Sequence, residues 1–347
     1  MNKQDIKSML ISELNDYFVS VGEKPFRAKQ VFSWLHSGTE TFDEMTNLSE
    51  PLRKKLDEHF YINKPHLIEK HISEIDGTTK FLWEMHDGSA VESVLMSYEH
   101  GNSVCISSQV GCKMGCAFCA SAIGGFKRNL TASEMVDQVL FSQIVSKTKV
   151  SNVVVMGIGE PLDNFDNLLK FLNLINHPSG MNIGARRISI STSGLIENID
   201  KLAEYKIQST LSVSLHAADD ETRTSLMPIN EKYGVDCLFQ ACKRYFSTTG
   251  RRVSFEYAMI SGINDTPRHA ELLIKRLSGT GSHLNLIPLS AVPERGLSGS
   301  SMKHIKEFAK LLSKSGINCT VRRSLGTDIT ASCGQLRVRH LSLKGSD

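Results

Sequence analysis

The sequence lacks a long hydrophobic run and an export signal. No segment approaches the roughly 18 consecutive apolar residues that a membrane-spanning helix needs. The N-terminus, Met1–Asp5, leads into a mixed polar and apolar pattern without an apolar core or a small-residue cleavage site. We therefore expect a cytoplasmic protein with no membrane partner, in a compartment where thiols are kept reduced and disulfide frameworks are rare.

The sequence also lacks a strong charge imbalance, internal repeats and low-complexity segments. Its net charge is +3, so composition alone gives no argument for nucleic-acid binding. Hydrophobic residues make up 40% and charged residues 22%, which is typical of a folded globular protein. A chain of 347 residues can form one large domain and a smaller one.

The first 65 residues and the next 34 differ in pattern. Apolar residues recur at three- and four-residue spacings near the start of residues 1–65, which predicts a helical N-terminal accessory domain. Residues 66–99 contain short alternating runs separated by Asp76-Gly77 and Asp87-Gly88, which are typical of hairpin turns. This second segment is predicted to be a small antiparallel β unit.

From about residue 100, short strand-like runs alternate with segments long enough for helices, such as Ser133–Val145 and Asn164–Leu174. The expected strands are Val104–Ser108, Val153–Met156, Ile188–Thr192, Thr210–His216, Val253–Ile260, His283–Pro288 and Asn318–Val321. This alternation predicts an α/β fold in which residues 100–335 form a partial (β/α) barrel of parallel strands. The active site is expected at the C-terminal strand ends, and residues 336–347 form a C-terminal tail.

Three of the eight cysteines, Cys112, Cys116 and Cys119, follow an expected strand in a C-x3-C-x2-C arrangement. Three thiolates in one loop can bind three irons of a [4Fe-4S] cluster and leave the fourth iron open for a substrate or cosubstrate. Gly111 and Gly115 allow the backbone to approach the inorganic sulfides. The alternatives are a zinc site or three unrelated cysteines. Structural zinc requires four ligands, however, and no fourth Cys or His stands at a pairing distance.

The cysteine loop resembles that of the radical S-adenosylmethionine (SAM) superfamily. This resemblance implies that SAM binds the open iron through its amino and carboxylate groups. An electron from the cluster then splits SAM and produces a 5′-deoxyadenosyl radical. The expected cofactors are therefore one [4Fe-4S] cluster and SAM.

Several predicted strand ends carry small or polar residues that are candidates for SAM binding. The segment Met156–Pro161 does not fit a dinucleotide-binding fingerprint, because Leu162 stands where the third glycine is expected. Taken alone, it is equally well explained as a tight turn. After a cluster loop, we interpret Gly159 as allowing close approach and Glu160 as accepting a hydrogen bond from SAM. The other candidates are Ser191, Ser214, Leu215 and His216, although His216 alone would more often be structural.

Cys105 and Cys333 are further candidates. A single free cysteine is commonly a small buried hydrophobe, and we keep that interpretation for Cys237, Cys242 and Cys319. Cys333 differs because it lies in a polar, glycine-flanked segment downstream of Arg322-Arg323, and cationic neighbours lower the pKa of a thiol.

The resemblance extends over nearly the whole chain. Four segments are similar to those of the RlmN/Cfr family of RNA adenine methyltransferases: Val104–Cys112, Lys127–Thr131, Leu226–Asn230 and Cys333–Leu336. Phe126–Arg128 and Thr249–Arg252 favour the C2-methylating RlmN branch over the C8-methylating Cfr branch. The resemblance implies two substrates, an adenosine of 23S rRNA and an anticodon-loop adenosine of tRNA.

The family resemblance also implies a role for each catalytic candidate. Carbon 2 of adenine is electron-poor and does not attack a sulfonium methyl group directly. Cys333 instead takes a methyl group from one SAM, and the radical from a second SAM removes a hydrogen from it. The methylene radical adds to carbon 2, and Cys105 releases the adduct by forming a disulfide with Cys333. Glu92 matches the proton acceptor, although taken alone it would be interpreted as a solvated strand carboxylate.

The sequence departs from the family pattern in two places. Most relatives have Asn-Pro where this chain has Ser290-Ala291, and that asparagine contacts SAM, so Ser290 is the corresponding candidate. Near the reactive cysteine, three residues replace the usual Asp, Asp and Ala: Thr327, Thr330 and Ser332. The resemblance further implies an external, flavodoxin-like electron donor and a monomeric enzyme.

Four basic pairs are candidates for holding RNA phosphates: Lys127-Arg128, Arg186-Arg187, Arg251-Arg252 and Arg322-Arg323, with Arg337 and Arg339 beyond. Individually, each is more simply explained as a solvated face. Two other functions remain open from the residues alone. One is a radical SAM enzyme with another substrate, and the other is a zinc-stabilised RNA-binding protein without catalysis.

Overall fold

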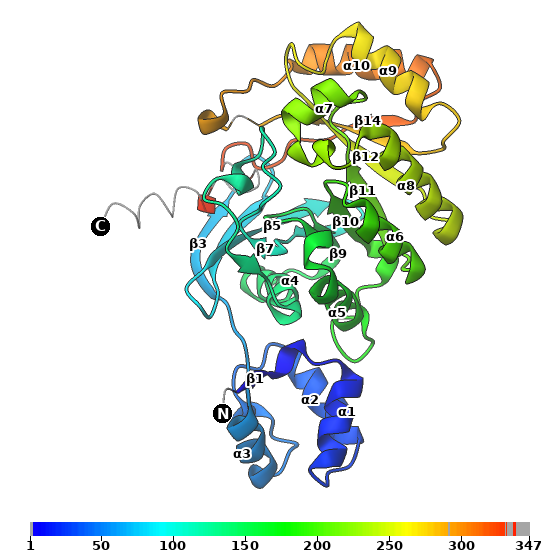
Figure 1. Ribbon diagram of the computed structural model, residues 1–347. Coiled ribbons are helices and arrows are strands. Elements are labelled where there is room, and N and C mark those ends of the chain that lie inside the picture. The colour runs from blue at the N-terminus through cyan, green and yellow to red at the C-terminus, as the bar shows by residue number, and fades with distance from the viewer. Residues whose placement is uncertain (1–2, 291, 330, 332–335, 338–347) are drawn as a thin grey trace.

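A computed structural model describes residues 3–290, 292–329, 331, 336 and 337 of the chain (Figure 1). In Figure 1 a group of N-terminal helices lies below a larger α/β body. Over these residues, no helix is both long and apolar enough to cross a membrane.

The N-terminal part is helical, as predicted. It contains α1 (Ile11–Ser20), α2 (Phe26–Leu35) and α3 (Glu50–His59), together with the short parallel pair β1 (Gln4–Asp5) and β2 (Phe60–Tyr61). The apolar stripe of α1 is buried and packs in the main core, because a helical period of 3.6 residues places those side chains on one face.

A single ten-stranded mixed sheet forms the centre of the larger part, in the order β14-β13-β12-β11-β10-β9-β6-β5-β4-β3. Its antiparallel strands are β3 (His66–Ile72), β4 (Thr79–Glu84) and β5 (Ala90–Tyr98). Its parallel strands are β6 (Gly101–Cys105), β9 (Val150–Val155), β10 (Ile188–Thr192), β11 (Thr210–Ser214), β12 (Val253–Met259), β13 (His283–Pro288) and β14 (Cys319–Val321). The edge strands β3 and β14 do not pair with each other within the described residues, so the predicted partial (β/α) barrel is confirmed.

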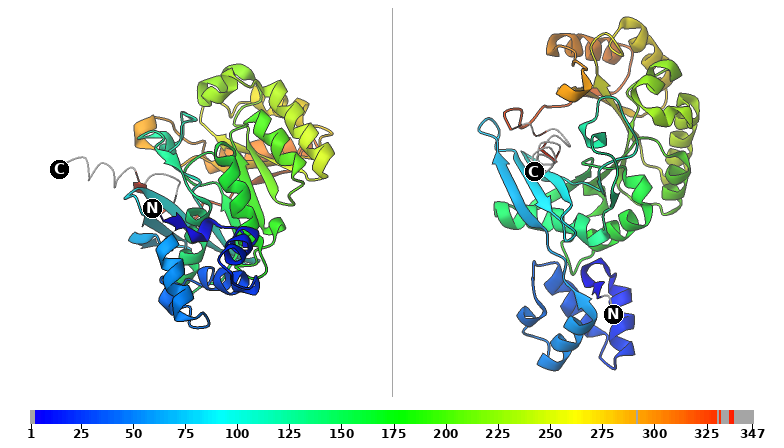
Figure 2. Two further views of the ribbon diagram at one scale, coloured as in Figure 1. Left: turned by 60° about the horizontal axis from the view of Figure 1, so that its bottom comes forward. Right: turned by 60° about the vertical axis from the view of Figure 1, so that its left-hand side comes forward.

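Crossover helices cover the outer side of this curved sheet, as the right-hand view in Figure 2 shows. They are α4 (Ala132–Ser146), α5 (Phe165–Asn176), α6 (Ile196–Glu204), α8 (Val235–Thr249), α9 (Pro267–Leu277) and α10 (Met302–Lys314). The short helix α7 (Asp220–Leu226) lies instead at the C-terminal strand ends, where Leu226 belongs to a separate small apolar cluster. The main core lies between sheet and helices. Val153 and Val155 of β9 are fully buried there with Leu168 and Phe171 of α5, whereas the alternate residue Val154 faces the inner side of the sheet.

Two predicted strands, β10 and β13, agree with the structure at both ends. β6 lies earlier than the predicted Val104–Ser108, because the Ser107 N–H donates to Gln138 Oε1 of α4 (2.8 Å) and not to a neighbouring strand. β11 ends before the predicted His216, whose φ of +54° is incompatible with an extended strand.

The predicted hairpin turns are confirmed at Gly77 and Gly88, whose φ angles are +72° and +75°. They connect β3 with β4 and β4 with β5. Strand β5 also pairs with β6, so the antiparallel unit continues the parallel sheet directly. Residues of the antiparallel unit and of the parallel strands therefore lie on the same inner face of one sheet.

Residues that follow β14 reach the turn between β3 and β4. The Ser73 hydroxyl and the Glu74 N–H donate to Asp328 (2.7 and 2.9 Å), and the Gly326 N–H donates to Asp76 (2.9 Å). We call these five residues the clasp. Their hydrogen bonds connect the two edges of the open sheet without strand pairing.

A buried ion pair joins the N-terminal part to the barrel. Lys7 Nζ lies 2.6 Å from Asp137 Oδ1 of α4, and both side chains are fully buried. Asn63 donates to the second oxygen of Asp137 (3.1 Å). The two parts are therefore connected by a polar contact that water does not reach.

Candidate active site at the strand ends

The cysteine loop lies between two short paired strands, β7 (Gln109–Val110) and β8 (Arg128–Asn129). Gly111 begins it with a φ of +80°, and a Cβ at this position would lie 1.7 Å from the Gly125 carbonyl oxygen. No other residue fits there. Farther along the loop, the Ala117 N–H donates to the Leu226 carbonyl (2.8 Å).

The three thiols of this loop influence one another. Burial, and to a smaller extent the charge of Cys119, raise the pKa of Cys112 to about 12. Burial, followed by the charges of Cys119 and Cys112, also raises the pKa of Cys116 well above its ordinary value. Such thiols stay protonated at neutral pH unless a cationic partner stabilises the thiolates. A donor set of three neighbouring thiols fits the predicted [4Fe-4S] cluster, with these cysteines as its ligands.

No three His, Cys, Asp or Glu side chains of the described residues are grouped so that they could hold a single metal ion.

The cysteine loop packs against the segment Leu226–Asn230. Cys116 and Phe118 contact the small apolar cluster that contains Leu226 and Met227. The Phe118 ring also meets the His216 ring edge to face, with centroids 4.7 Å apart. Three separate parts of the sequence therefore come together at the C-terminal strand ends.

The segment after β9 forms the predicted tight turn. A Cβ on Gly157 would lie 2.6 Å from the Ile106 carbonyl oxygen, and one on Gly159 would lie 2.5 Å from Gln109 Cβ. The Glu160 N–H donates to Gln109 Oε1 (2.8 Å). The turn is thus fixed against the residues that lead into the cysteine loop.

Glu160 is buried, and its carboxylate accepts hydrogen bonds from the backbone N–H groups of Leu162 (3.0 Å) and Ser193 (2.7 Å). Burial raises the pKa of Glu160, and these hydrogen bonds oppose that effect. The carboxylate therefore joins the ends of β9 and β10. Each oxygen can accept a further hydrogen bond, so its predicted contact with SAM stays a prediction.

The remaining strand-end candidates divide into two groups. Ser191 and Ser214 are partly exposed on β10 and β11, and Ser290 is exposed after β13. Leu215 and His216 are buried. His216 Nδ1 accepts from the Ala258 N–H (2.9 Å), and burial lowers the pKa of His216 to about 3, so the ring is neutral and has a structural contact.

Arg223 connects these strand ends, although no sequence pattern predicts this role. Its buried guanidinium donates to the carbonyl groups of Ser193 (2.8 Å) and Leu215 (3.1 Å) and to Asn230 Oδ1 (2.9 Å). Burial lowers its pKa to about 10, so it remains charged at neutral pH. An arginine in the short polar helix α7 would ordinarily be solvated, and only the tertiary structure identifies this one.

Glu92 and Cys105 lie together on the inner face of the antiparallel strands. Glu92 is 3% exposed, so its interpretation as a solvated strand carboxylate is wrong. Its Oε2 lies 3.0 Å from the ammonium of Lys80, a second residue that sequence reasoning missed. A lysine next to the apolar run Phe81–Trp83, in a strand opposite one that carries a glutamate, was the available signal.

Cys105 lies on the same face, because Lys80 pairs with Val94 and Val94 pairs with Cys105. Burial raises the pKa of the Cys105 thiol, and the nearby Arg322 guanidinium partly opposes this. The resting side chain is therefore a thiol. Cys333, Thr330 and Ser332 lie outside the described residues, so the predicted pairing of Cys105 with Cys333 stays a prediction.

The basic pairs do not form one surface at this site. Arg128 pairs with Asp87 (2.7 Å) and Glu134 (2.8 Å). Arg186-Arg187 and Arg251-Arg252 precede β10 and β12, so they lie at the opposite strand ends from the cysteine loop. The exposed cations on the cysteine-loop side include Lys127 and Arg323, whereas Arg337 is buried.

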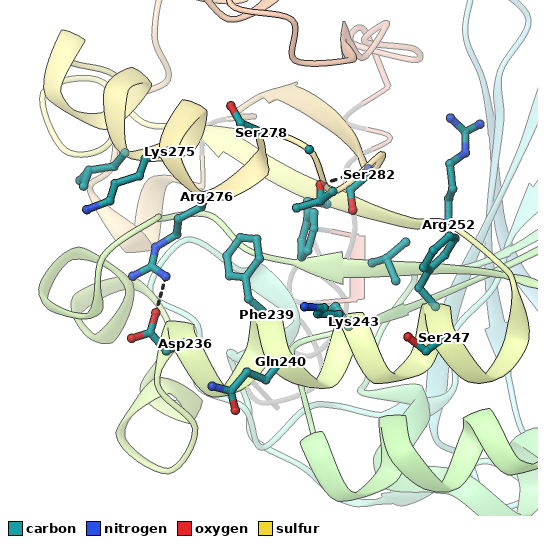
Figure 3. Close-up of a pocket in the computed structure, with 17 residues that line it drawn as sticks. Asp236, Phe239, Gln240, Lys243, Ser247, Arg252, Lys275, Arg276, Ser278 and Ser282 are labelled. Atoms are coloured by element: carbon teal, nitrogen blue, oxygen red, sulfur yellow. Dashed lines mark hydrogen bonds and ion pairs between the residues drawn. The ribbon is translucent and has the colours of Figure 1, made fainter.

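A separate groove of about 860 Å³ lies on the outer side of the barrel between α8 and α9 (Figure 3). Phe239 and Lys243 of α8 and Arg276 of α9 line it, and Arg276 pairs with Asp236 across it. Its other walls include Arg252 and the segment before β13, which lie at the N-terminal strand ends. The groove shares no residue with the predicted site.

Comparisons with known proteins agree with this arrangement. Residues 4–62 match the ribosomal RNA large subunit methyltransferase N-terminal domain, and residues 106–277 match the radical SAM superfamily. A probable dual-specificity RNA methyltransferase RlmN of Clostridium novyi is 48% identical over 97% of this chain and 99% of its own. A probable dual-specificity RNA methyltransferase RlmN of Alkaliphilus oremlandii is also 48% identical, over 98% of this chain and 99% of its own.

A solved structure supports the same assignment. The crystal structure of a radical SAM methyltransferase from Sphaerobacter thermophilus superposes with a TM-score of 0.90 at 40% identity, over 96% of this chain and 98% of that one. The chain therefore belongs to the radical SAM superfamily and, within it, to the RlmN family of RNA methyltransferases, enzymes that act with a [4Fe-4S] cluster and SAM.

Proposed function

We propose that this protein methylates carbon 2 of an adenosine in 23S rRNA and of an anticodon-loop adenosine in tRNA, through a methyl group carried on Cys333. The observation that carries this proposal is the arrangement of two groups of residues around one mixed sheet. The cysteine loop packs at its C-terminal strand ends, and Glu92 and Cys105 share the inner face beside it.

The cofactor site is assigned from the same arrangement. Cys112, Cys116 and Cys119 would hold the cluster. The wall for SAM would consist of Gly159, Glu160, Ser191, Ser214, Leu215, His216 and Ser290. When bound, the cluster and SAM together supply the 5′-deoxyadenosyl radical. The protein residues hold these groups in place and limit access of water to them.

Three residues of the chain would act on the RNA. Cys333 carries the methyl group to the base, and Glu92 accepts a proton from the base. Cys105 then forms a disulfide with Cys333, so that the bond between the Cys333 sulfur and the methylated base breaks. The raised pKa of the Cys105 thiol supports this assignment, because a protonated thiol does not react before the adduct forms.

We further propose the domain division 1–65, 66–99, 100–335 and 336–347, with the helical N-terminal domain helping to hold RNA. Exposed cations beside the cysteine loop, such as Lys127 and Arg323, support phosphate contacts there. A flavodoxin-like protein would deliver the electrons, and the enzyme would act as a monomer in the cytoplasm.

The deciding experiment is anaerobic methylation of unmodified RNA. The cluster is reconstituted, a reductant and SAM are added, and nucleosides from 23S rRNA and tRNA are analysed by mass spectrometry. We expect 2-methyladenosine in both RNAs from the wild-type enzyme and none from the Cys333→Ala variant. 8-Methyladenosine would place the enzyme in the Cfr branch. Formation of 5′-deoxyadenosine without RNA methylation would refute the RNA assignment, and methylation by Cys333→Ala would refute the methyl-carrier role.

A further inference from the structure

Lys80 occupies an unusual place for a lysine. It lies within β4, next to the buried Phe81, and its side chain is 0% exposed. An isolated ammonium is very costly to bury unless an opposite charge and hydrogen bonds compensate. Glu92 provides that charge, with Oε2 at 3.0 Å. The pair is therefore held in one geometry by the packing around it.

The two carboxylate oxygens of Glu92 have different neighbours. Oε2 faces Lys80, whereas Oε1 accepts a hydrogen bond from the backbone N–H of Arg337. Arg337 follows Cys333 by four positions in the chain. Oε1 thus contacts the backbone of a residue that follows the proposed methyl carrier closely in the chain.

Other charged and titratable groups approach Glu92 from the remaining elements. Cys105 of β6 is close enough for Glu92 and Lys80 to influence its pKa, and so is Arg322, which follows β14. Arg337 interacts electrostatically with Glu92, and burial lowers the pKa of Arg337. Among the described residues of this group, Lys80 is the cation that forms a direct ion pair with the Glu92 carboxylate.

We propose that Lys80 is a positioning residue for proton transfer: it holds Oε2 of Glu92 and so directs Oε1, which also accepts from the Arg337 N–H, to take the proton from carbon 2 of adenine. In this step the carbon–hydrogen electron pair stays with the purine, and Glu92 becomes a neutral carboxylic acid. Lys80 keeps its own protons throughout. This inference rests on the proposed function, because Glu92 acts only in adduct resolution.

The test compares Lys80→Met, which removes the charge, with Lys80→Arg, which retains it. For Lys80→Met we expect wild-type iron content and wild-type 5′-deoxyadenosine formation, but a covalent protein–RNA adduct that accumulates on denaturing gels. Methyladenosine formation should fall by about tenfold or more. Its pH profile should differ from that of the wild type on the acidic side, because the cation beside Oε2 is removed. Lys80→Arg should restore most of the rate and the wild-type profile.

Lys70→Met is the matched control, because Lys70 is exposed on the neighbouring strand β3. It should leave rate and profile unchanged. Wild-type methylation and pH profile in Lys80→Met would overturn the proposal, as would loss of 5′-deoxyadenosine formation in both Lys80 variants. Should Lys80→Met not fold, Lys80→Gln and Lys80→Arg decide by the same readouts. A wild-type enzyme that neither methylates RNA nor forms an adduct would instead refute the proposed function.

Discussion

At the scale of single residues, the turn after β9 depends on the absence of side chains. Gly159 has a φ of +110°, and a Cβ there would contact both the side chain and the backbone of Gln109. The backbone of this turn must therefore move if Gly159 carries a side chain.

Gly159→Ala should displace the turn that carries Glu160 and weaken SAM binding by about tenfold, a cost of roughly 1–3 kcal/mol for a strained backbone. Equilibrium dialysis of SAM with the reconstituted enzyme measures the effect. Gly184→Ala is the control, because a Cβ there meets nothing within 4 Å. Equal SAM affinity in the two variants would contradict this account of the turn.

Local spacing allowed some site residues to be predicted and not others. The cysteine loop and the turn with Gly159 and Glu160 are visible in the sequence, because their residues are neighbours in the chain. Lys80 and Arg223 are not, because their partners belong to other elements. His216 stays a predicted SAM contact, and its ring also has a structural contact with the Ala258 N–H that the local sequence does not reveal.

At the scale of elements, helix α2 ends at a buried histidine. His36 is its C-cap, and the His36 ring stacks on Phe32 with centroids 4.2 Å apart. Both ring nitrogens are buried and have no hydrogen-bond partner among the described residues. Burial lowers the pKa of His36 from 6.5 to about 3.

The N-terminal helices should therefore lose stability in mild acid. The unfolded histidine binds a proton near pH 6.5 and the folded one only near pH 3, so stability falls as the pH falls through this window. Between pH 7 and pH 5 this histidine costs about 2 kcal/mol. Urea unfolding at pH 7 and pH 5 should show a smaller loss of stability for His36→Phe than for the wild type. His66→Phe, at an exposed position, should lose as much stability as the wild type.

Strand positions were predictable where apolar runs and strands coincide, as in β10 and β13. Strand ends were less predictable where a side-chain hydrogen bond or a left-handed residue ends the pairing between strands. The end of β6 depends on Gln138 of α4, and the end of β11 on the left-handed backbone of His216. Neither contact is encoded in the local pattern.

At the scale of the whole molecule, the attachment of the helical part depends on Lys7 and Asp137. Lys7→Met would leave the Asp137 carboxylate buried without its cation, at a cost of about 3–5 kcal/mol. We expect a lower urea concentration at the unfolding midpoint and faster proteolysis between the N-terminal helical part and the barrel. Changing Asp137 to Leu as well should recover most of the loss. Lys3→Met, which breaks an exposed pair with Asp57, should cost less than about 1 kcal/mol.

The alternation of strands and helices predicted the partial barrel, but not how its parts are connected. The Lys7–Asp137 pair and the clasp join residues that lie far apart in the chain. No periodicity within one element carries information on such contacts.

The order of the strands has a consequence for synthesis. Because the strands of the large sheet follow one another in chain order, a chain leaving the ribosome can add each new strand to the edge completed just before. The cysteine loop is translated early, whereas Asp328 and Gly326 of the clasp come last. Cofactor delivery to the nascent protein can therefore precede closure of the clasp.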